Sequence, residues 1–211
     1  MKKESLLFLC LCLITLTTNA QSFRYGVIGG INLSKPAGDT GADGSKAGLL
    51  LGAKGELDLP MIAKGTYLDF GLQISAKGYK SSIFMDADNN HVKWERNINY
   101  LNIPIHIGYK IRCGKALSLF ANAGPYMGIG LWGKIKSYNN GKETASSSKV
   151  FDDNNGLKRL DYGIGANIGL EYAKHFQLII GHDWGLKDIN NYTGAGKYKN
   201  KNFSLSIAYI F

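Results

Sequence analysis

Residues 160–172, LDYGIGANIGLEY, carry an apolar side chain at every even position and a glycine or polar side chain at every odd position. Because successive side chains of a β-strand point to opposite faces, this alternation predicts a strand with one apolar and one polar face. The segment is longer than an ordinary globular strand of about 5–6 residues, and it exceeds the about 9–11 residues needed to cross a membrane. It therefore predicts a membrane-spanning strand.

The same alternation recurs along the chain and is clearest in residues 203–211, FSLSIAYIF. The expected strands are residues 22–33, 47–59, 66–79, 100–110, 117–132, 160–172, 176–186 and 203–211. Long and short connections alternate between them, as in outer-membrane barrels with long external loops and short periplasmic turns. We therefore expect an all-β fold, namely a monomeric, eight-stranded antiparallel up-and-down transmembrane β-barrel.

Alternation alone does not decide which face of the barrel looks outward, because a soluble ligand-carrying barrel has an apolar lumen. Here most glycines lie on the polar face, and the crowded lumen of a small barrel needs small residues. The apolar face carries almost no charge and has aromatic residues at both ends, as at two membrane interfaces. The expected periplasmic girdle is Phe23, Tyr25, Tyr109, Tyr172, Phe176, Tyr209 and Phe211, and the opposite one is Trp94, Trp132 and Trp184. The polar face is therefore predicted to line the lumen.

Residues 1–20 have the features of a secretory signal peptide. Lys2 and Lys3 precede an apolar run over residues 6–16, which is too short to cross a bilayer of about 30 Å as a helix. Ala20 precedes the expected cut, so residues 21–211 should form the outer-membrane β-barrel domain. That part contains a single cysteine, Cys113, and so no internal disulfide is expected.

The formal net charge of the chain is +9, which could indicate an anionic partner. An exported protein rarely meets nucleic acid, so no nucleic-acid partner is expected. Outer-membrane lipid and lipopolysaccharide are the expected surroundings. The lysine-rich loops 133–159 and 187–202 are candidate external contact surfaces for lipopolysaccharide phosphates or a protein partner. Simple solvation of these loops is the favoured interpretation, and such contacts are the alternative.

The polar face carries charges of both signs, which would be costly in a narrow lumen unless they pair. We expect one paired network that closes the barrel to ions. Its predicted members are Arg24, Lys54, Glu56, Asp69, Lys77, Asp161 and Glu171. Charges nearer the strand ends, Asp58, Lys110 and Asp183, are expected to reach water and to contribute less.

Several short motifs together resemble the PorT-type outer-membrane β-barrel domain proteins. They are Tyr100-Leu101-Asn102-Ile103-Pro104-Ile105, Gly124-Pro125-Tyr126-Met127-Gly128, Asp161-Tyr162-Gly163-Ile164-Gly165-Ala166, Gly181-His182-Asp183-Trp184-Gly185-Leu186 and the terminal Phe211. The resemblance implies an outer-membrane barrel without catalytic residues, and it implies little about function, since most members have no known role and some assist a protein secretion system.

No catalytic, cofactor-binding or metal-binding residues are predicted. The spaced glycines of residues 128–133 match a dinucleotide fingerprint, but they lie within a strand and no helix pattern follows. Asp86, Asp88 and Asn90 have the opening spacing of a calcium loop, which lacks the glycine and glutamate that would complete it.

The leading interpretation is a structural or interaction protein without enzymatic activity. The alternative is an outer-membrane lipid A-modifying enzyme, because His182 lies next to Asp183 and His106 is also on the polar face. Neighbours in one strand point to opposite faces, so His182 and Asp183 cannot form a catalytic dyad directly.

Overall fold

The computed structural model describes residues 22–38, 44–81, 83–85, 89–152, 156–191 and 196–211. The predicted signal peptide, residues 1–20, and the expected cut before Gln21 lie outside the described residues. Asp86 and Asp88 of the calcium-like motif lie outside them as well. Within the described ranges, no helix is long and apolar enough to cross a membrane.

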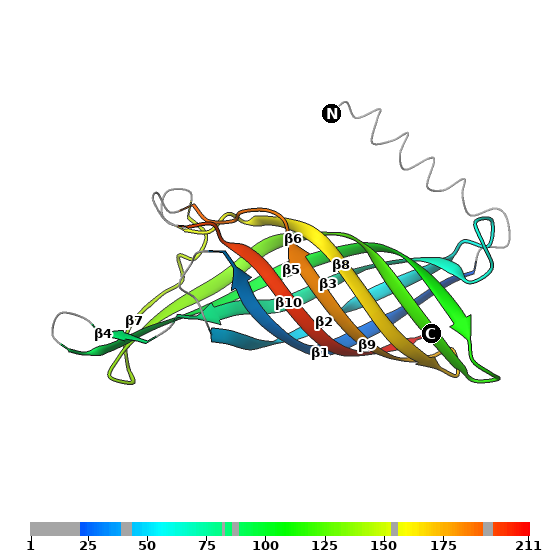
Figure 1. Ribbon diagram of the computed structural model, residues 1–211, viewed down its shortest axis with the longest axis horizontal. Helices are drawn as coiled ribbons and strands as arrows, with labels where there is room; N and C mark the ends of the chain where they lie inside the picture. Colours follow the sequence, from blue (N-terminus) through cyan, green and yellow to red (C-terminus); the bar gives the residue numbers. More distant parts are fainter. Residues whose placement is uncertain (1–21, 39–43, 82, 86–88, 153–155, 192–195) are drawn as a thin grey trace, which may run out of the picture.

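The described residues form ten strands, eight of which close into a ring of antiparallel pairs (Figure 1). The ring strands are β1 Phe23–Ala37, β2 Gly44–Asp58, β3 Thr66–Lys80, β5 His91–Arg112, β6 Leu117–Asn139, β8 Leu160–Tyr172, β9 Phe176–Gly185 and β10 Lys199–Ile210. Strands β1 and β10 pair from Gly26–Ile210 to Ala37–Lys199, and the β5–β6 pairing completes the circle. The predicted up-and-down barrel is confirmed.

Two of the ring strands are much longer than predicted. Strand β5 begins at His91 and β6 ends at Asn139, whereas residues 91–99 and 133–139 were expected to be loop. Their ladder continues outward to the Val92–Asn139 pair. Outside the membrane both faces of a sheet can meet water, so the apolar alternation disappears although the backbone pairing does not.

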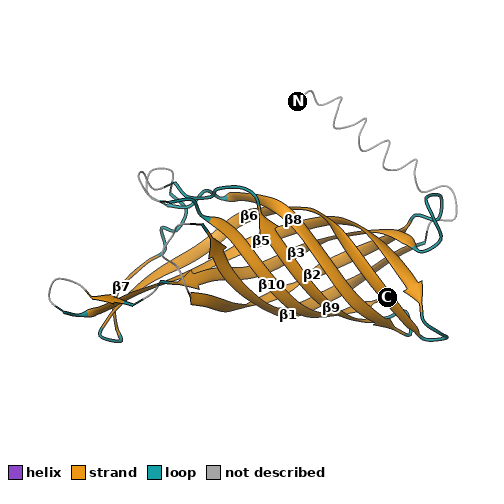
Figure 2. Cartoon of the chain, viewed as in Figure 1, coloured by secondary structure: helices purple, strands orange, loops and turns teal. Residues whose placement is uncertain are grey.

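Two short strands extend this projecting hairpin into a small sheet. Strand β4, Phe84–Met85, pairs with β5, and β7, Lys142–Ser147, pairs with β6. We call β4, β7 and residues 91–99 and 133–139 the external blade; it extends beyond the ring at the end opposite the C-terminus (Figure 2). Part of the predicted loop 133–159 is therefore strand, and β10 likewise begins at Lys199, inside the predicted loop 187–202.

The apolar face of the ring points outward. Leu49 and Leu51 are 71% and 69% exposed, and both predicted aromatic girdles are also exposed on the outer surface. In water, burial of such side chains would be worth about 25 cal/mol per Å², so a continuous exposed band of them requires an apolar surrounding. The predicted outward orientation is confirmed.

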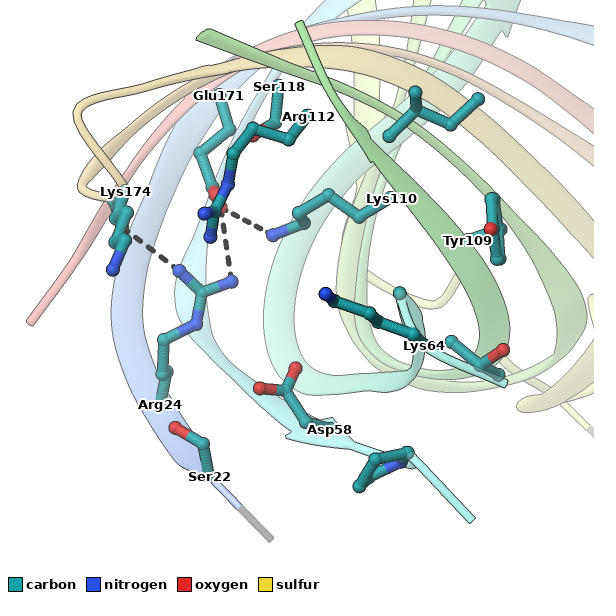
Figure 3. Close-up of a pocket in the computed structure, with 14 residues that line it drawn as sticks. Ser22, Arg24, Asp58, Lys64, Tyr109, Lys110, Arg112, Ser118, Glu171 and Lys174 are labelled. Carbon is teal, nitrogen blue, oxygen red and sulfur yellow. Dashed lines mark hydrogen bonds and ion pairs between the residues drawn. The ribbon is translucent and has the colours of Figure 1, made fainter. Parts of the chain in front are cut away.

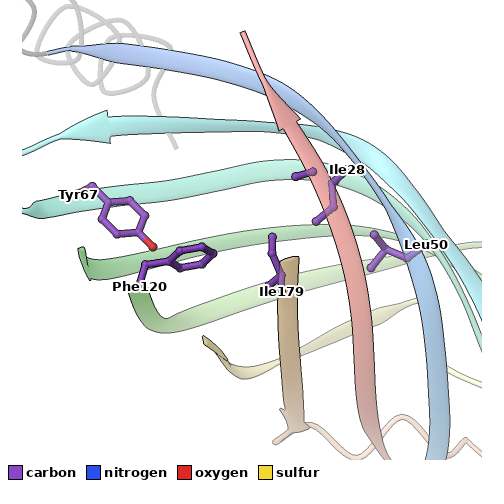
Figure 4. Close-up of a cluster of buried hydrophobic side chains, with 6 residues drawn as sticks. Ile28, Leu50, Tyr67, Phe120 and Ile179 are labelled. Atoms are coloured by element: carbon purple, nitrogen blue, oxygen red, sulfur yellow. The ribbon is translucent and has the colours of Figure 1, made fainter. Parts of the chain in front are cut away.

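The lumen contains one apolar layer that the sequence pattern did not single out. Ile28, Leu50, Tyr67, Phe120, Ile179 and Ala208 are buried together inside the ring (Figure 4). The rings of Tyr67 and Phe120 meet edge to face, with their centroids 6.4 Å apart. Glycine makes room for both rings, because a Cβ on Gly108 would lie 2.6 Å from Tyr67 and one on Gly169 2.4 Å from Phe120.

We predict that Gly108→Val lowers the free energy of unfolding by about 1–3 kcal/mol, as overpacked cores do. The added Cβ would meet the Tyr67 ring and, at 2.7 Å, the Cβ of Asn122, so the neighbours must shift. Urea unfolding in detergent micelles, followed by tryptophan fluorescence, measures the change. Ala123→Val is the matched control, because Ala123 lies on the exposed outer face. Equal midpoints for the two variants would contradict the crowded lumen.

Candidate functional site

A cluster of charged side chains crosses the half of the lumen nearer the short turns. Its centre is the Glu56 carboxylate, which is fully buried and forms an ion pair with Arg24. Glu56 also accepts hydrogen bonds from Lys54 Nζ at 3.2 Å, Lys110 Nζ at 3.1 Å and Gln177 Nε2 at 2.7 Å. Four donors from four different strands, three of them cationic, therefore contact one carboxylate.

Two further carboxylates complete this cluster. Glu171 accepts from Lys110 Nζ at 2.5 Å and from Arg24 Nη2 at 3.1 Å. Asp69 lies 2.7 Å from Lys54 Nζ. We call these residues, together with Gln177, the inner ion cluster; its charged members are Arg24, Lys54, Glu56, Asp69, Lys110 and Glu171. Three cations balance three carboxylates, so the cluster carries no net charge.

A second cluster lies closer to the external end. The Lys77 ammonium is 3.9 Å from Asp183 Oδ2 and stands over the ring of Tyr126 at 5.0 Å. Asp161 accepts hydrogen bonds from Asn200 Nδ2 at 2.8 Å and from the Tyr126 hydroxyl at 3.4 Å. These residues form the outer ion cluster.

The expected single network is therefore divided. Five predicted members lie in the inner ion cluster, whereas Lys77 and Asp161 lie in the outer one, and no ion pair between described residues joins the two. Lys110 was expected to contribute less, but it bonds both Glu56 and Glu171. Its position near a strand end was misleading, because a long lysine side chain can reach back into the barrel. Asp183 was also underrated, since it is the partner of Lys77.

Polar side chains without formal charge separate the two clusters. Asn122 Oδ1 accepts from Asn167 Nδ2 at 2.8 Å, and Asn122 Nδ2 donates to the Tyr67 hydroxyl at 3.1 Å. His106 Nδ1 lies 3.1 Å from Asn122 Oδ1. One cavity at this level has a volume of about 40 Å³. That is room for about one or two water molecules.

The external mouth is covered by folded loops. Val150, Leu157, Ile189 and Tyr198 pack on Ile98 and Tyr100 of β5. Residues 148–152, 156–159, 187–191 and 196–198 make up this external cap. Parts of the candidate contact loops 133–159 and 187–202 therefore lie in this cap, with these apolar side chains turned inward over the barrel.

Backbone hydrogen bonds hold the external cap together. Leu157 N donates to Val150 O at 2.8 Å, and Lys158 N donates to Ile189 O at 2.8 Å. The Asp188 carboxylate accepts from the amides of Tyr198 at 2.9 Å and Asn190 at 3.0 Å. Partial burial would raise the pKa of Asp188, but the two amide hydrogen bonds outweigh it and lower that pKa. The carboxylate therefore favours the folded cap at neutral pH.

The opposite mouth is open. A cavity of about 570 Å³ lies among the short turns, and charged residues of the inner ion cluster form its floor (Figure 3). We call this cavity the vestibule. Its charged lining residues are Arg24, Asp58, Lys64, Lys110, Arg112, Glu171 and Lys174.

The two histidines of the enzyme alternative have different surroundings. His106 is buried in the lumen and its hydrogen-bond partners are Asn122 and Asn167. The His182 ring lies 4.4 Å from the Trp184 ring, centroid to centroid. Among the described residues, neither histidine is hydrogen-bonded to a serine or a carboxylate.

A closed ring of eight antiparallel strands, apolar outside and charged inside, defines a small transmembrane β-barrel of the outer-membrane class. The family model described as outer membrane protein beta-barrel domain matches residues 19–191. The chain belongs to this family, and the outer membrane is its location. Comparison with curated protein sequences finds no match.

Similarity to individual solved structures is weak. Ail of Yersinia pestis, in complex with the heparin analogue sucrose octasulfate, is 13% identical over 90% of this chain and 99% of that chain, with a TM-score of 0.41. Neisserial surface protein A is 13% identical over 92% and 100%, with a TM-score of 0.42. OprG from Pseudomonas aeruginosa is 13% identical over 90% and 97%, with a TM-score of 0.42.

We predict that Glu56→Ala destabilises the barrel by about 3–5 kcal/mol, because it leaves Lys54, Lys110 and Arg24 short of a buried counter-charge. The fraction of folded protein that survives heating, resolved by gel mobility, measures the effect. Glu143→Ala is the control, since Glu143 pairs with Lys136 on the solvent-exposed blade. If both variants resisted heat like the unaltered protein, the inner ion cluster would not be a stabilising element.

Proposed function

We propose that this protein has a structural or interaction role in the outer membrane, with a closed lumen and no catalytic activity. The observation that carries the proposal is the inner ion cluster, whose members come from six of the eight ring strands. Such a cluster links different strands of the barrel through side-chain bonds in the lumen. The cavity at the next level, about 40 Å³, is too small to form a path for solutes.

The proposed closed lumen rests on the free energy that separating its buried ion pairs would cost. Opening a path for ions would separate charges that are buried and paired, and each unpaired ion inside a protein costs several kcal/mol. The external cap adds a second barrier, made of apolar side chains, over the same axis. A barrel with both features suits a protein that acts through its surface.

The external blade is the best-placed surface for contacts. It carries Lys134, Lys136 and Lys142 from the predicted contact loop 133–159, and all six residues of β7 are exposed. Lysines at this level could meet the phosphates of lipopolysaccharide or an acidic protein partner. Outer-membrane lipid surrounds the ring below, and the protomer acts as a monomer without nucleic acid or cofactor.

We also propose a narrower family group and an export route for this protein. The motifs from Tyr100 to Phe211 support membership of the PorT-type group within the family. The basic and apolar pattern of residues 1–20 supports export through a cleaved signal peptide in a Gram-negative cell.

The alternative is a lipid A-modifying enzyme that uses His182 and His106. We predict that the double variant His182→Ala/His106→Ala leaves the lipid A of cells that express the barrel unchanged. The reason is that His106 bonds only asparagine side chains and His182 packs on Trp184. Mass spectrometry of extracted lipid A measures the outcome, and cells without the protein are the control. A lipid A species that disappears with both the double variant and the deletion would favour the enzyme.

A further inference from the structure

The vestibule is a cavity whose lining contains more cationic than acidic side chains. It has a volume of about 570 Å³, which lies within the about 300–1,000 Å³ of small-molecule sites. Five of its lining residues are cationic, namely Arg24, Lys64, Lys110, Arg112 and Lys174. Only Asp58 and Glu171 among the lining residues are acidic.

Two of these cations are already neutralised. Arg24 and Lys110 both contact Glu171 in the lining and Glu56 just beneath it. Counting Glu56 with the lining leaves five cations against three carboxylates, so the vestibule has a net charge of +2. The excess comes from side chains outside the inner ion cluster.

Outside the inner ion cluster the lining has Lys64, Arg112 and Lys174 against Asp58. Lys64 and Arg112 lie close together, because the turn before β3 adjoins the end of its paired strand β5. Lys64 lies in the turn between β2 and β3, and Arg112 is the last residue of β5. Within the described part of the chain, neither side chain forms an ion pair or a hydrogen bond. Figure 3 shows the charged ends of Lys64, Lys110, Arg112 and Arg24 directed toward the same central space.

We propose that the vestibule binds a small periplasmic ligand that carries two or more phosphate or carboxylate groups. The net charge of +2 matches two negative charges, and the planar guanidinium of Arg112 can hold one oxyanion through two parallel hydrogen bonds. Lys64 is a flexible point charge that can follow the second anionic group. Arg24 and Lys110 form the floor, and their guanidinium and ammonium groups are further donors near the ligand.

The open end of the barrel gives the site its access. In outer-membrane barrels the short turns face the periplasm, and the vestibule lies among the short turns. The external cap lies over the other mouth, so the ligand reaches the site from the periplasm. This site is independent of the external blade, and it goes beyond the proposed structural or interaction role.

Calorimetric titration of the folded protein in neutral detergent at low salt tests the proposal, with inorganic pyrophosphate as one probe and citrate as the other. The unaltered protein should bind at least one probe at a single site, and the relative affinities separate phosphate from carboxylate preference. Lys64→Gln/Arg112→Gln should weaken binding by about tenfold or more, since it removes two charged donors. Added salt should weaken binding too, through charge screening.

Lys134→Gln/Lys142→Gln is the matched control, because it removes the same charge from the external blade. It should bind as the unaltered protein does. Heat resistance on a gel verifies that both variants are folded, and neither substitution touches the inner ion cluster. Failure of the unaltered protein to bind either probe, or equal affinity in the vestibule variant, would overturn the proposal. Equal loss in the blade variant would also overturn it, because binding would then reflect overall charge.

Discussion

The structure depends on the neutralisation of a buried carboxylate, Glu56, inside a narrow ring of eight strands. Eight strands enclose only enough room for side chains, so every charge in the lumen must find its partner inside the barrel. Arg24, Lys54 and Lys110 supply those partners from β1, β2 and β5. Arg24 is the cross-strand neighbour of Glu56, and Lys54 lies on the same strand as Glu56. The bonds from Gln177 to Glu56 and from Arg24 to Glu171 join strands that are not paired with each other, and they complement the backbone pairing between neighbours.

The remaining features follow from the same shortage of space. Glycines such as Gly108 and Gly169 lie where the rings of Tyr67 and Phe120 cross the interior, because any side chain there would collide with them. The outer face is free of this constraint and carries large apolar residues that suit lipid. Beyond the membrane, the chain covers the external mouth with an apolar cap and leaves the opposite mouth as a basic vestibule.

The number of strands, their direction and the face that each turns outward were predictable from the sequence. One side of each strand contacts lipid, so apolar and polar side chains alternate along it. The signal disappears in residues 91–99 and 133–139, where both faces lie outside the membrane although the backbone pairing continues. The pairing of lumen charges was harder to predict, since strand position does not determine the reach of Lys110. The external cap was not predictable from local pattern, because Val150, Leu157 and Ile189 come together only in the folded chain.

The central claim is that paired charges and the side chains around them close the lumen. Recording ionic current across a planar bilayer that contains the folded, unaltered protein tests this claim most directly. The account predicts no steady conductance above that of the protein-free bilayer. Large, stable channels would contradict it, because they would require a continuous water path through the inner ion cluster and the void of about 40 Å³ beside it.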